Sequence, residues 1–415
     1  MKFNSLFKLY AMDIEQFKKT FISRFNSEST IKLFVEINGN QAFFFYHNEI
    51  NRLVYKIREM DKRVNKLFEK LPSVAKNQYI KKCLIDEVCH TNAIEGIIST
   101  RKEIRELIED INLNIDSKKR FKGIVNRYFK MTNNEEIRLE KPQDIRDLYD
   151  EILLEEIKND DINNVPDGIM FRKDNVNVTT SSGKIIHTGI MPESKIVEYI
   201  DETLIIINDE SMEPVIRIAI AHYLFSYIHP FYDGNGRINR FISSYILSKY
   251  CTPIIAYRLS ATIKENLSTY YDAFKITNDI RNRADITTFV YEFLKIIYLA
   301  YEKTETYALS KLNEVNLYVE KTQELSYCKA LKDLLNILIQ AEIFSENGVT
   351  INEISTQLDL SISTCRNNLN KLIEEDLVIQ RYFGKKKVYS ADLDRINKKC
   401  NNFMSDSDVF FNNII

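Results

Sequence analysis

Apolar residues recur at three- and four-residue intervals along most of the chain, which is the period of an amphipathic helix. Residues 49–70 show the pattern most fully, with one apolar face formed by Ile50, Leu53, Val54, Ile57, Met60, Val64 and Leu67. The same period predicts further helices at 77–90, 101–112, 143–158, 194–208, 212–228, 237–250, 284–305 and 308–322. The pattern therefore predicts a mainly α-helical protein.

Patterns typical of strands are few. Residues 176–190 (VNVTTSSGKIIHTGI) place two β-favouring arms around the turn-like Ser181-Ser182-Gly183, which predicts a β-hairpin. The run FFFY at 43–46 is too short to predict a strand by itself. Polar stretches at 113–120 and 131–137 predict loops between helices.

The residues after about 323 follow a different order: helix, turn, helix, turn, helix and hairpin. A first helix is expected at 329–343, Thr350 with Glu353 forms a capping box for the second, and Ser361 caps the third. The alternating run around Gly384 then predicts a two-stranded wing. This order is typical of a winged helix-turn-helix.

Composition narrows the class of protein. The chain has 57 Lys and Arg against 59 Asp and Glu, so its net charge of −2 gives no global electrostatic case for nucleic acid or acidic membranes. No signal peptide is recognisable, and charges interrupt every long apolar stretch. The six cysteines show no CxxC pair and no His at zinc-finger spacing. We therefore expect a cytoplasmic protein with no membrane span, no disulfide framework and no structural zinc.

Glycine is scarce, with 10 in 415 residues, yet Pro230, Gly234 and Gly236 fall within seven residues. Where glycine is rare, such a cluster indicates backbone geometry that other residues cannot adopt. The cluster lies in IHPFYDGNGRINR (228–240), between two helices expected to be buried.

This segment carries the residue types that phosphate chemistry requires. The N–H groups of 234–236 and of the following helix N-terminus would form an anion-binding concavity. Arg237 and Arg240 lie one helical turn apart and suit a polyphosphate. Asp233 beside that anion predicts a bridging Mg²⁺. His229 can accept the proton of an attacking hydroxyl, because its ordinary pKa lies near working pH.

Residues 229–240 (HPFYDGNGRINR) match the Fic family signature, H-P-F-x-[DE]-G-N-G-R-x-x-R, without departures, and the chain resembles that family. The resemblance implies a Fic helical core with a small β-hairpin flap. It also implies transfer of AMP from ATP to a Ser, Thr or Tyr hydroxyl of a target protein, with Mg²⁺ as cofactor.

The resemblance also assigns roles to residues. It implies that His229 deprotonates the hydroxyl, that Phe231 anchors the loop in the core, and that Asp233 holds Mg²⁺. The anion hole is implied at Gly234, Asn235 and Gly236, with Asn235 orienting the α-phosphate and Arg237 and Arg240 holding the distal phosphates.

Two further elements resemble parts of Fic proteins. The segment HTNAIEG (90–96) is similar to the inhibitory motif [ST]-x-x-x-E-[GN] at Thr91, Glu95 and Gly96, and Gly96 is a natural helix stop. The resemblance implies that Glu95 pairs with Arg240, displaces the γ-phosphate and keeps the enzyme largely inhibited. The hairpin implies a flap that aligns the target by strand addition, at Gly183, Lys184, Ile185, Ile186 and His187.

These assignments predict four parts. They are an N-terminal helical domain with the inhibitory helix at 1–112, a Fic catalytic domain at 113–322, a winged helix-turn-helix at 323–400 and a tail at 401–415. Outside the signature, we expect His222 to be a core histidine, and Tyr270 and Tyr271 to pack rather than bind nucleotide.

Alternatives stay open. The same site would also suit removal of AMP from modified proteins, with Glu95 helping to activate water, or transfer of another nucleotide.

A rival of another class is a DNA-binding transcriptional regulator, with a basic wing of Arg381 and 385–387 and with Arg366, Asn367 and Asn370 facing a groove. Residues 325–395, however, carry 9 Lys and Arg against 10 Asp and Glu. DNA binding is therefore less favoured than a protein-interaction or dimer-forming role, and whether a homodimer forms is left open.

Overall fold

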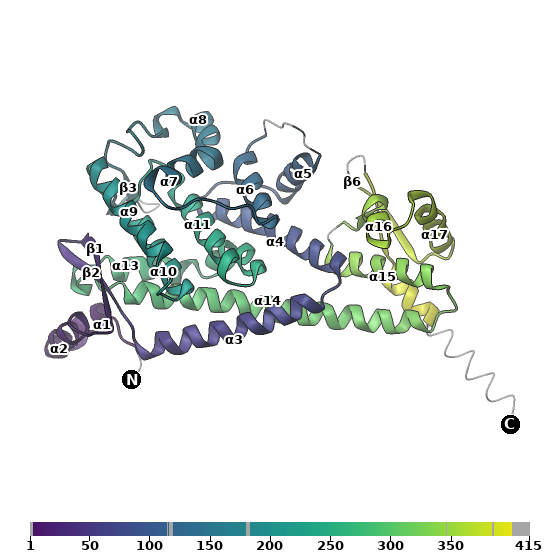
Figure 1. Ribbon diagram of the computed structural model, residues 1–415, viewed down its shortest axis with the longest axis horizontal. Helices are drawn as coiled ribbons and strands as arrows, with labels where there is room; N and C mark the ends of the chain where they lie inside the picture. The colour runs from purple at the N-terminus through teal and green to yellow at the C-terminus, as the bar shows by residue number, and fades with distance from the viewer. Residues whose placement is uncertain are drawn as a thin grey trace, which may run out of the picture. The chain divides into compact units, whose positions relative to one another are not determined.

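A computed structural model of the chain describes residues 3–113, 115, 119–179, 183–345, 347–383 and 386–400 (Figure 1). Most of these residues are helical, and the strands among them form three small antiparallel sheets, so the expected mainly α-helical class is confirmed. Two compact units emerge, Met1–Lys62 with Leu84–Glu302 and Arg63–Cys83 with Lys303–Ile415. The four domain limits expected from sequence stay predictions. None of the described helices has an apolar run long enough to cross a membrane.

The first unit begins with two short helices and a hairpin. These elements are α1 (Leu6–Met12), α2 (Ile14–Phe25), β1 (Thr30–Ile37) and β2 (Asn40–Phe45). Phe43 of β2 is fully buried in a cluster with Leu6, Leu9 and Phe17. The first three residues of the run FFFY therefore belong to strand β2. The run is too short to predict this by itself, because the strand depends on hydrogen bonds to its partner β1. The part of helix α3 (Asn48–Lys70) up to Lys62 and the part of α4 (Ser73–Ile94) from Leu84 also belong to this unit.

Helix α10 (Pro214–Ile228) of this unit has nearly all of its residues buried. It packs against α9 and α11 (Figure 1). The remaining helices of this unit are α5 (Arg101–Asn112), α6 (Lys122–Thr132), α7 (Pro142–Tyr149), α8 (Glu155–Asp160), α9 (Glu193–Asn208), α11 (Asn235–Tyr250), α12 (Leu259–Glu265), α13 (Leu267–Thr277) and the first part of α14 (Thr287–Gln323). A helix that is apolar all round, as α10 is, belongs at the centre of a core.

Two helix predictions are confirmed as helical segments but differ in how the segments are divided. The segments 284–305 and 308–322 form the single helix α14, because no Gly or Pro separates them. The predicted helix 143–158 is helical from Pro142 to Asp160, with a π-helical turn at Asp150–Leu154 between α7 and α8. Helix α6 packs on this turn through Gly123, where a side chain would collide with the carbonyls of Glu151 and Ile152.

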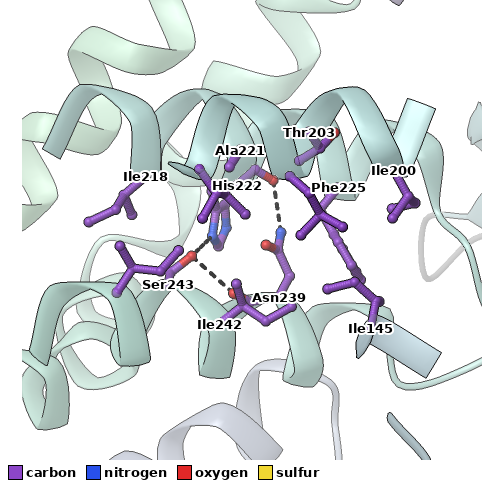
Figure 2. A pocket seen from close by; sticks show the side chains of 13 residues that line it. Ile145, Ile200, Thr203, Ile218, Ala221, His222, Phe225, Asn239, Ile242 and Ser243 are labelled. Atoms are coloured by element: carbon purple, nitrogen blue, oxygen red, sulfur yellow. Dashed lines mark hydrogen bonds between the residues drawn. The ribbon is translucent and has the colours of Figure 1, made fainter. Parts of the chain in front are cut away.

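A small cavity lies in the core between α9, α10 and α11 (Figure 2). Most of its wall is aliphatic, and the polar groups on it are already paired: His222 Nδ1 lies 2.8 Å from Ser243 Oγ, and Asn239 Nδ2 donates to the His222 carbonyl at 2.8 Å. His222 Nε2 lies 2.8 Å from the Tyr270 hydroxyl, and burial lowers the pKa of His222 well below its ordinary value. His222 is therefore a core histidine, as expected, and Tyr270 packs beside it, whereas Tyr271 is half exposed.

The second unit contains the winged helix-turn-helix. Its elements after α14 are α15 (Lys329–Phe344), β5 (Val349–Thr350), α16 (Ile351–Leu358), α17 (Ile362–Glu374), β6 (Val378–Phe383) and β7 (Lys386–Ala391), with strand order β5-β7-β6. The capping box of Thr350 with Glu353 and the Ser361 cap are both present, so these predictions are confirmed. Gly384 and Lys385 of the expected wing lie outside the described residues.

Candidate active site

The expected signature segment forms the loop between α10 and α11 and the first turns of α11. Helix α10 ends at Ile228, and His229 then takes a left-handed backbone (φ 54°, ψ 63°), which is uncommon for a residue with a side chain. Gly234 is also left-handed (φ 82°), and a side chain there would collide with Leu153. Helix α11 begins at Asn235, so its free N–H groups lie within the signature.

Phe231 and Asn235 brace this loop. The fully buried Phe231 ring stacks on Tyr149 with centroids 3.7 Å apart and contacts Phe171 edge-on. The Asn235 side chain accepts from the Phe231 N–H at 2.9 Å and donates to the Phe231 carbonyl at 2.7 Å. Phe231 therefore anchors the loop in the core, as expected. The Asn235 amide holds the loop closed, and its role toward an α-phosphate stays a prediction.

His229 is neutral and has one nitrogen able to accept a proton. Its Nδ1 lies 3.4 Å from the Ser226 carbonyl, which can only accept, and this contact favours the tautomer with the proton on Nδ1 and the lone pair on Nε2. Burial, and after it the neighbouring His187, lower the pKa of His229 to about 4. At neutral pH the imidazole therefore has the charge state of a general base.

The two arginines of the signature are buried and held by different carboxylates. Arg237 Nη1 lies 2.5 Å from Glu156 Oε1, and its Nε and Nη2 are buried without a hydrogen-bond partner. Arg240 donates to Thr91 Oγ1 at 2.8 Å, to the Thr91 carbonyl at 2.9 Å and to Glu95 Oε1 at 2.7 Å. Orphaned buried donors are rare in proteins. Those of Arg237 therefore fit an anionic ligand such as a phosphate.

Glu95 follows the last residue of α4, and its side chain reaches the N-terminus of α11. The turn closes at Gly96, which is left-handed (φ 75°) as a helix stop requires. A methyl group at Gly236 would collide with the Glu95 carboxylate, so this carboxylate lies directly against the Gly236 backbone. The expected inhibitory glutamate thus lies at the helix terminus where the sequence predicts an anion.

Helix α4 is anchored two turns before Glu95. The fully buried Glu87 carboxylate accepts from the Ser260 N–H at 2.9 and 3.0 Å and from its hydroxyl at 2.6 Å. Burial raises the pKa of Glu87, and the hydrogen bonds from Ser260 oppose that rise. Lys264 donates to the Ala93 carbonyl at 3.0 Å and so satisfies part of the helix end. The main chain of the helix is therefore fixed independently of the Glu95 side chain.

The expected flap is the two-stranded sheet of β3 (Asn177–Thr179) and β4 (Ile185–Thr188). Gly183 is left-handed, and Lys184, Ile185 and Ile186 are exposed. His187 is different: its Nε2 donates to the Tyr227 carbonyl at 2.6 Å, and burial lowers its pKa. Ser181 and Ser182 of the turn lie outside the described residues. Within the described part of the chain no third strand covers β4, which leaves an edge for strand addition.

Asp233 is the expected metal ligand. Its side chain is 46% exposed, accepts from the Gly234 N–H at 2.6 Å and lies 3.9 Å from Arg237. Among the described residues no group of three or more His, Cys, Asp or Glu side chains could hold a metal ion. Mg²⁺ commonly uses one or two carboxylates together with phosphate oxygens and water. A single exposed carboxylate beside a phosphate site therefore fits Mg²⁺ bound with a nucleotide.

Three residues around the loop were not found from the sequence: Tyr149, Glu156 and Arg172. The π-helical turn lies between the first two, so that Tyr149 stacks on Phe231 while Glu156 pairs with Arg237. Such turns are frequent at functional sites. A signal for Glu156 existed, because this charged residue continues the apolar face of Ile152 and Leu153. Nothing local marks Arg172.

Comparison with known proteins assigns two segments of the chain. A family model described as the Fic/DOC family matches residues 139–247, and one described as winged helix-turn-helix DNA-binding matches residues 331–379. The chain is 32% identical to protein adenylyltransferase Fic of Drosophila grimshawi over 142 residues, and this match covers 34% of this chain and 23% of that protein. It is 33% identical to protein adenylyltransferase fic-1 of Caenorhabditis briggsae over 94 residues, and this match covers 22% of this chain and 17% of that protein.

The chain thus spans less than a quarter of the length of these curated relatives. Among solved structures, a Fic family protein from Desulfovibrio desulfuricans is similar, with a TM-score of 0.49 and 21% identity over 84% of this chain and 97% of that one. The chain therefore carries a Fic/DOC family domain at residues 139–247 and a winged helix-turn-helix at residues 331–379.

Proposed function

We propose that the chain is a protein adenylyltransferase that Glu95 inhibits at rest. The observation that carries the proposal is the Glu95 carboxylate, which lies against Gly236 and pairs with Arg240 at 2.7 Å. A carboxylate in that place stands where the N-terminus of α11 and two buried guanidiniums favour phosphate oxygens. The Fic/DOC match and the relatives named protein adenylyltransferase support the same activity.

The reaction we propose joins a target hydroxyl to the α-phosphorus of ATP. His229 Nε2 takes the hydroxyl proton, the oxygen–phosphorus bond forms, and the bond from the α-phosphorus to the bridging oxygen breaks, releasing pyrophosphate. Mg²⁺ held by Asp233 would neutralise phosphate charge. Arg237 and Arg240 orient the distal phosphates, and the exposed edge of β4 aligns the target Ser, Thr or Tyr.

Inhibition follows from charge and space in the same pocket. Glu95 occupies one guanidinium that the distal phosphates need, and its negative charge repels them. The nucleotide then lacks the contact that orients its α-phosphorus toward His229. Because α4 is anchored by Glu87, displacement of the Glu95 side chain relieves the block without requiring the helix to leave its site.

Transfer of radiolabelled AMP from α-³²P-ATP to proteins tests this function. Glu95→Gly is expected to raise transfer by about 10- to 100-fold, the factor that corresponds to a charge-assisted hydrogen bond of about 1.5–3 kcal/mol. Glu103→Gly, at the exposed start of α5, is the matched control and should leave transfer unchanged. Transfer that stays at background in Glu95→Gly would contradict the proposal. Loss of AMP from a pre-modified target only when Glu95 is present would instead support AMP removal.

A DNA-binding role for the winged helix-turn-helix is the second candidate. Residues 331–379 match a DNA-binding family model, and Arg366, Asn367 and Asn370 all lie on the exposed face of α17. These side chains are types that contact phosphates and base edges. A mobility-shift titration in salt, comparing the protein's own upstream DNA with random duplex, tests this role. Equal weak affinity for both duplexes would exclude sequence-specific binding.

A further inference from the structure

Arg172 is a fully buried cation for which no ion pair with a carboxylate is found in the described part of the chain. Burial lowers the pKa of Arg172 to about 10, so the guanidinium remains charged at neutral pH. A buried unpaired charge is costly unless other groups satisfy it. The side chain therefore needs compensation from the backbone around it.

All five N–H donors of Arg172 are used, and four of the acceptors are backbone carbonyls. Nε donates to the His229 carbonyl at 2.8 Å, and Nη1 donates to the Asp174 carbonyl at 2.7 Å and to Met191 Sδ at 3.2 Å. Nη2 donates to the Ile190 carbonyl at 2.8 Å and to the Ile228 carbonyl at 3.4 Å. The guanidinium thus joins the end of α10, the left-handed residue after it, and the segment that follows β4.

The same segment after β4 completes the end of α10. The last carbonyls of a helix have no partner within the helix and must be satisfied by other groups. Here His187 donates to the Tyr227 carbonyl, and the Ile190 N–H donates to the Ile228 carbonyl at 3.0 Å. Gly189 approaches Arg172 so closely that a side chain would collide with it, and the same side chain would lie in tight contact with His229. The cation at this terminus also opposes the negative end of the helix dipole.

We propose that Arg172 is a positioning residue that holds the left-handed backbone of His229 and ties it to the strand expected to dock the target. This inference rests on the proposed function, because it treats His229 as the base. A non-glycine residue in the left-handed region costs about 1 kcal/mol or more and persists only where its surroundings hold it. The fork of Arg172 provides that hold. Movement of β4 is therefore transmitted to His229 rather than absorbed by the loop.

Arg172→Lys in the Glu95→Gly protein tests the proposal, since an ammonium has three donors and cannot reproduce the planar fork. We expect kcat for AMP transfer to fall on the order of 10²-fold, as displacement of a reacting group by about 1 Å does. KM for ATP should stay unchanged, because Arg172 contacts no phosphate-binding residue. The matched control is Arg146→Lys, which loses a bond to the Met170 carbonyl but leaves the loop intact.

Two further measurements separate positioning from mere stability. Millimolar guanidinium should restore transfer to Arg172→Ala, and thermal unfolding of Arg172→Lys should match that of the control. By NMR, the pKa of His229 should rise from about 4 in Arg172→Lys, while that of His222 stays low. This readout does not depend on transfer, so it tests the inference even if Glu95→Gly proves inactive and the proposed function fails. Transfer equal to the control, or loss of the folded state in both Arg172 variants, would overturn the proposal.

Discussion

The signature loop at 229–240 and the end of α4 at 91–96 meet at Arg240 but are held in different ways. The loop is fixed along its length, by the Phe231 stack on Tyr149, by the Asn235 hydrogen bonds and by the Arg172 fork. The end of α4 reaches the loop through the Thr91 and Glu95 contacts with Arg240. Arg240 is 2% exposed, whereas Glu95 is 32% exposed.

In the function we propose, this difference separates a permanent catalytic frame, the signature loop, from a removable block, the Glu95 side chain. Buried and mutually supporting contacts cannot be broken singly without disturbing the loop. A partly exposed carboxylate can rotate away at the cost of one charge-assisted hydrogen bond. Variants of the loop should therefore lower transfer, and variants of the end of α4 should raise it.

The largest effect is expected at His229. His229→Ala in the Glu95→Gly protein should lower transfer by about 10²- to 10⁴-fold, the usual contribution of a positioned base. ATP binding measured by calorimetry should persist, because Arg237 and Arg240 remain. His47→Ala, a histidine before α3, is the control and should keep full transfer. Retained transfer in His229→Ala would show that His229 is not the base. The contrast between a catalytic loop and an inhibitory end of α4 would then fail.

Asn235→Ala should weaken the frame itself. The change leaves the buried Phe231 N–H without its acceptor, and the free energy of unfolding should fall by about 1–3 kcal/mol. Transfer should fall by about tenfold, because the loop no longer holds its shape. Asn282→Ala likewise removes an acceptor of a main-chain N–H, that of Phe7, and a donor to a carbonyl, that of Asp285, and provides the match in chemical denaturation. An equal loss of transfer in both variants would indicate that the brace has no special role.

Thr91→Val tests the other side of the comparison. It removes one hydroxyl partner of Arg240 while keeping the side-chain shape and leaving Glu95 in place. One hydrogen bond of about 0.5–1.5 kcal/mol corresponds to a two- to tenfold rise in AMP transfer by the otherwise unchanged chain. Thr203→Val, whose hydroxyl donates to the Tyr199 carbonyl in α9, should have no such effect. A fall in transfer would show that Thr91 supports the signature loop rather than inhibition by Glu95.

The smallest expected effect is in the pH response. The folded-state pKa of His229 is about 4 against an ordinary 6.5, so between these values the unfolded chain binds a proton that the native protein does not. The contribution of His229 to the free energy of unfolding is thus complete above pH 6.5 and is lost as pH falls toward 4. Glu95 raises the pKa of His229, so Glu95→Gly should lower it further. Titration by NMR measures the pKa of His229 in the unchanged chain and in Glu95→Gly. A pKa near 6.5 in the unchanged chain would contradict the expectation that burial lowers it.

Local patterns sufficed where the partners lie close in the chain. The Thr350–Glu353 capping box, the hairpin at 176–190 and the helix stop at Gly96 all involve residues within one turn or one hairpin. The π-helical turn after Tyr149 could not be predicted in this way, because local periodicity does not show which element packs on it, here α6 at Gly123. The length of α14 was also not predicted, because the only sequence signal for one continuous helix is that no Gly or Pro divides it.

The sequence by itself determined that the chain is mainly helical and which segment we propose for phosphate chemistry, because the signature is contiguous and its glycines and charges have few other uses. The tertiary structure decided which groups hold that chemistry in place. Arg172 reaches the His229 carbonyl 57 residues away, Glu156 reaches Arg237 across 81, and Glu95 reaches Arg240 across 145. Such contacts arise only when packing brings distant segments of the chain together, since periodicity shows which face a side chain lies on and not which residue it contacts.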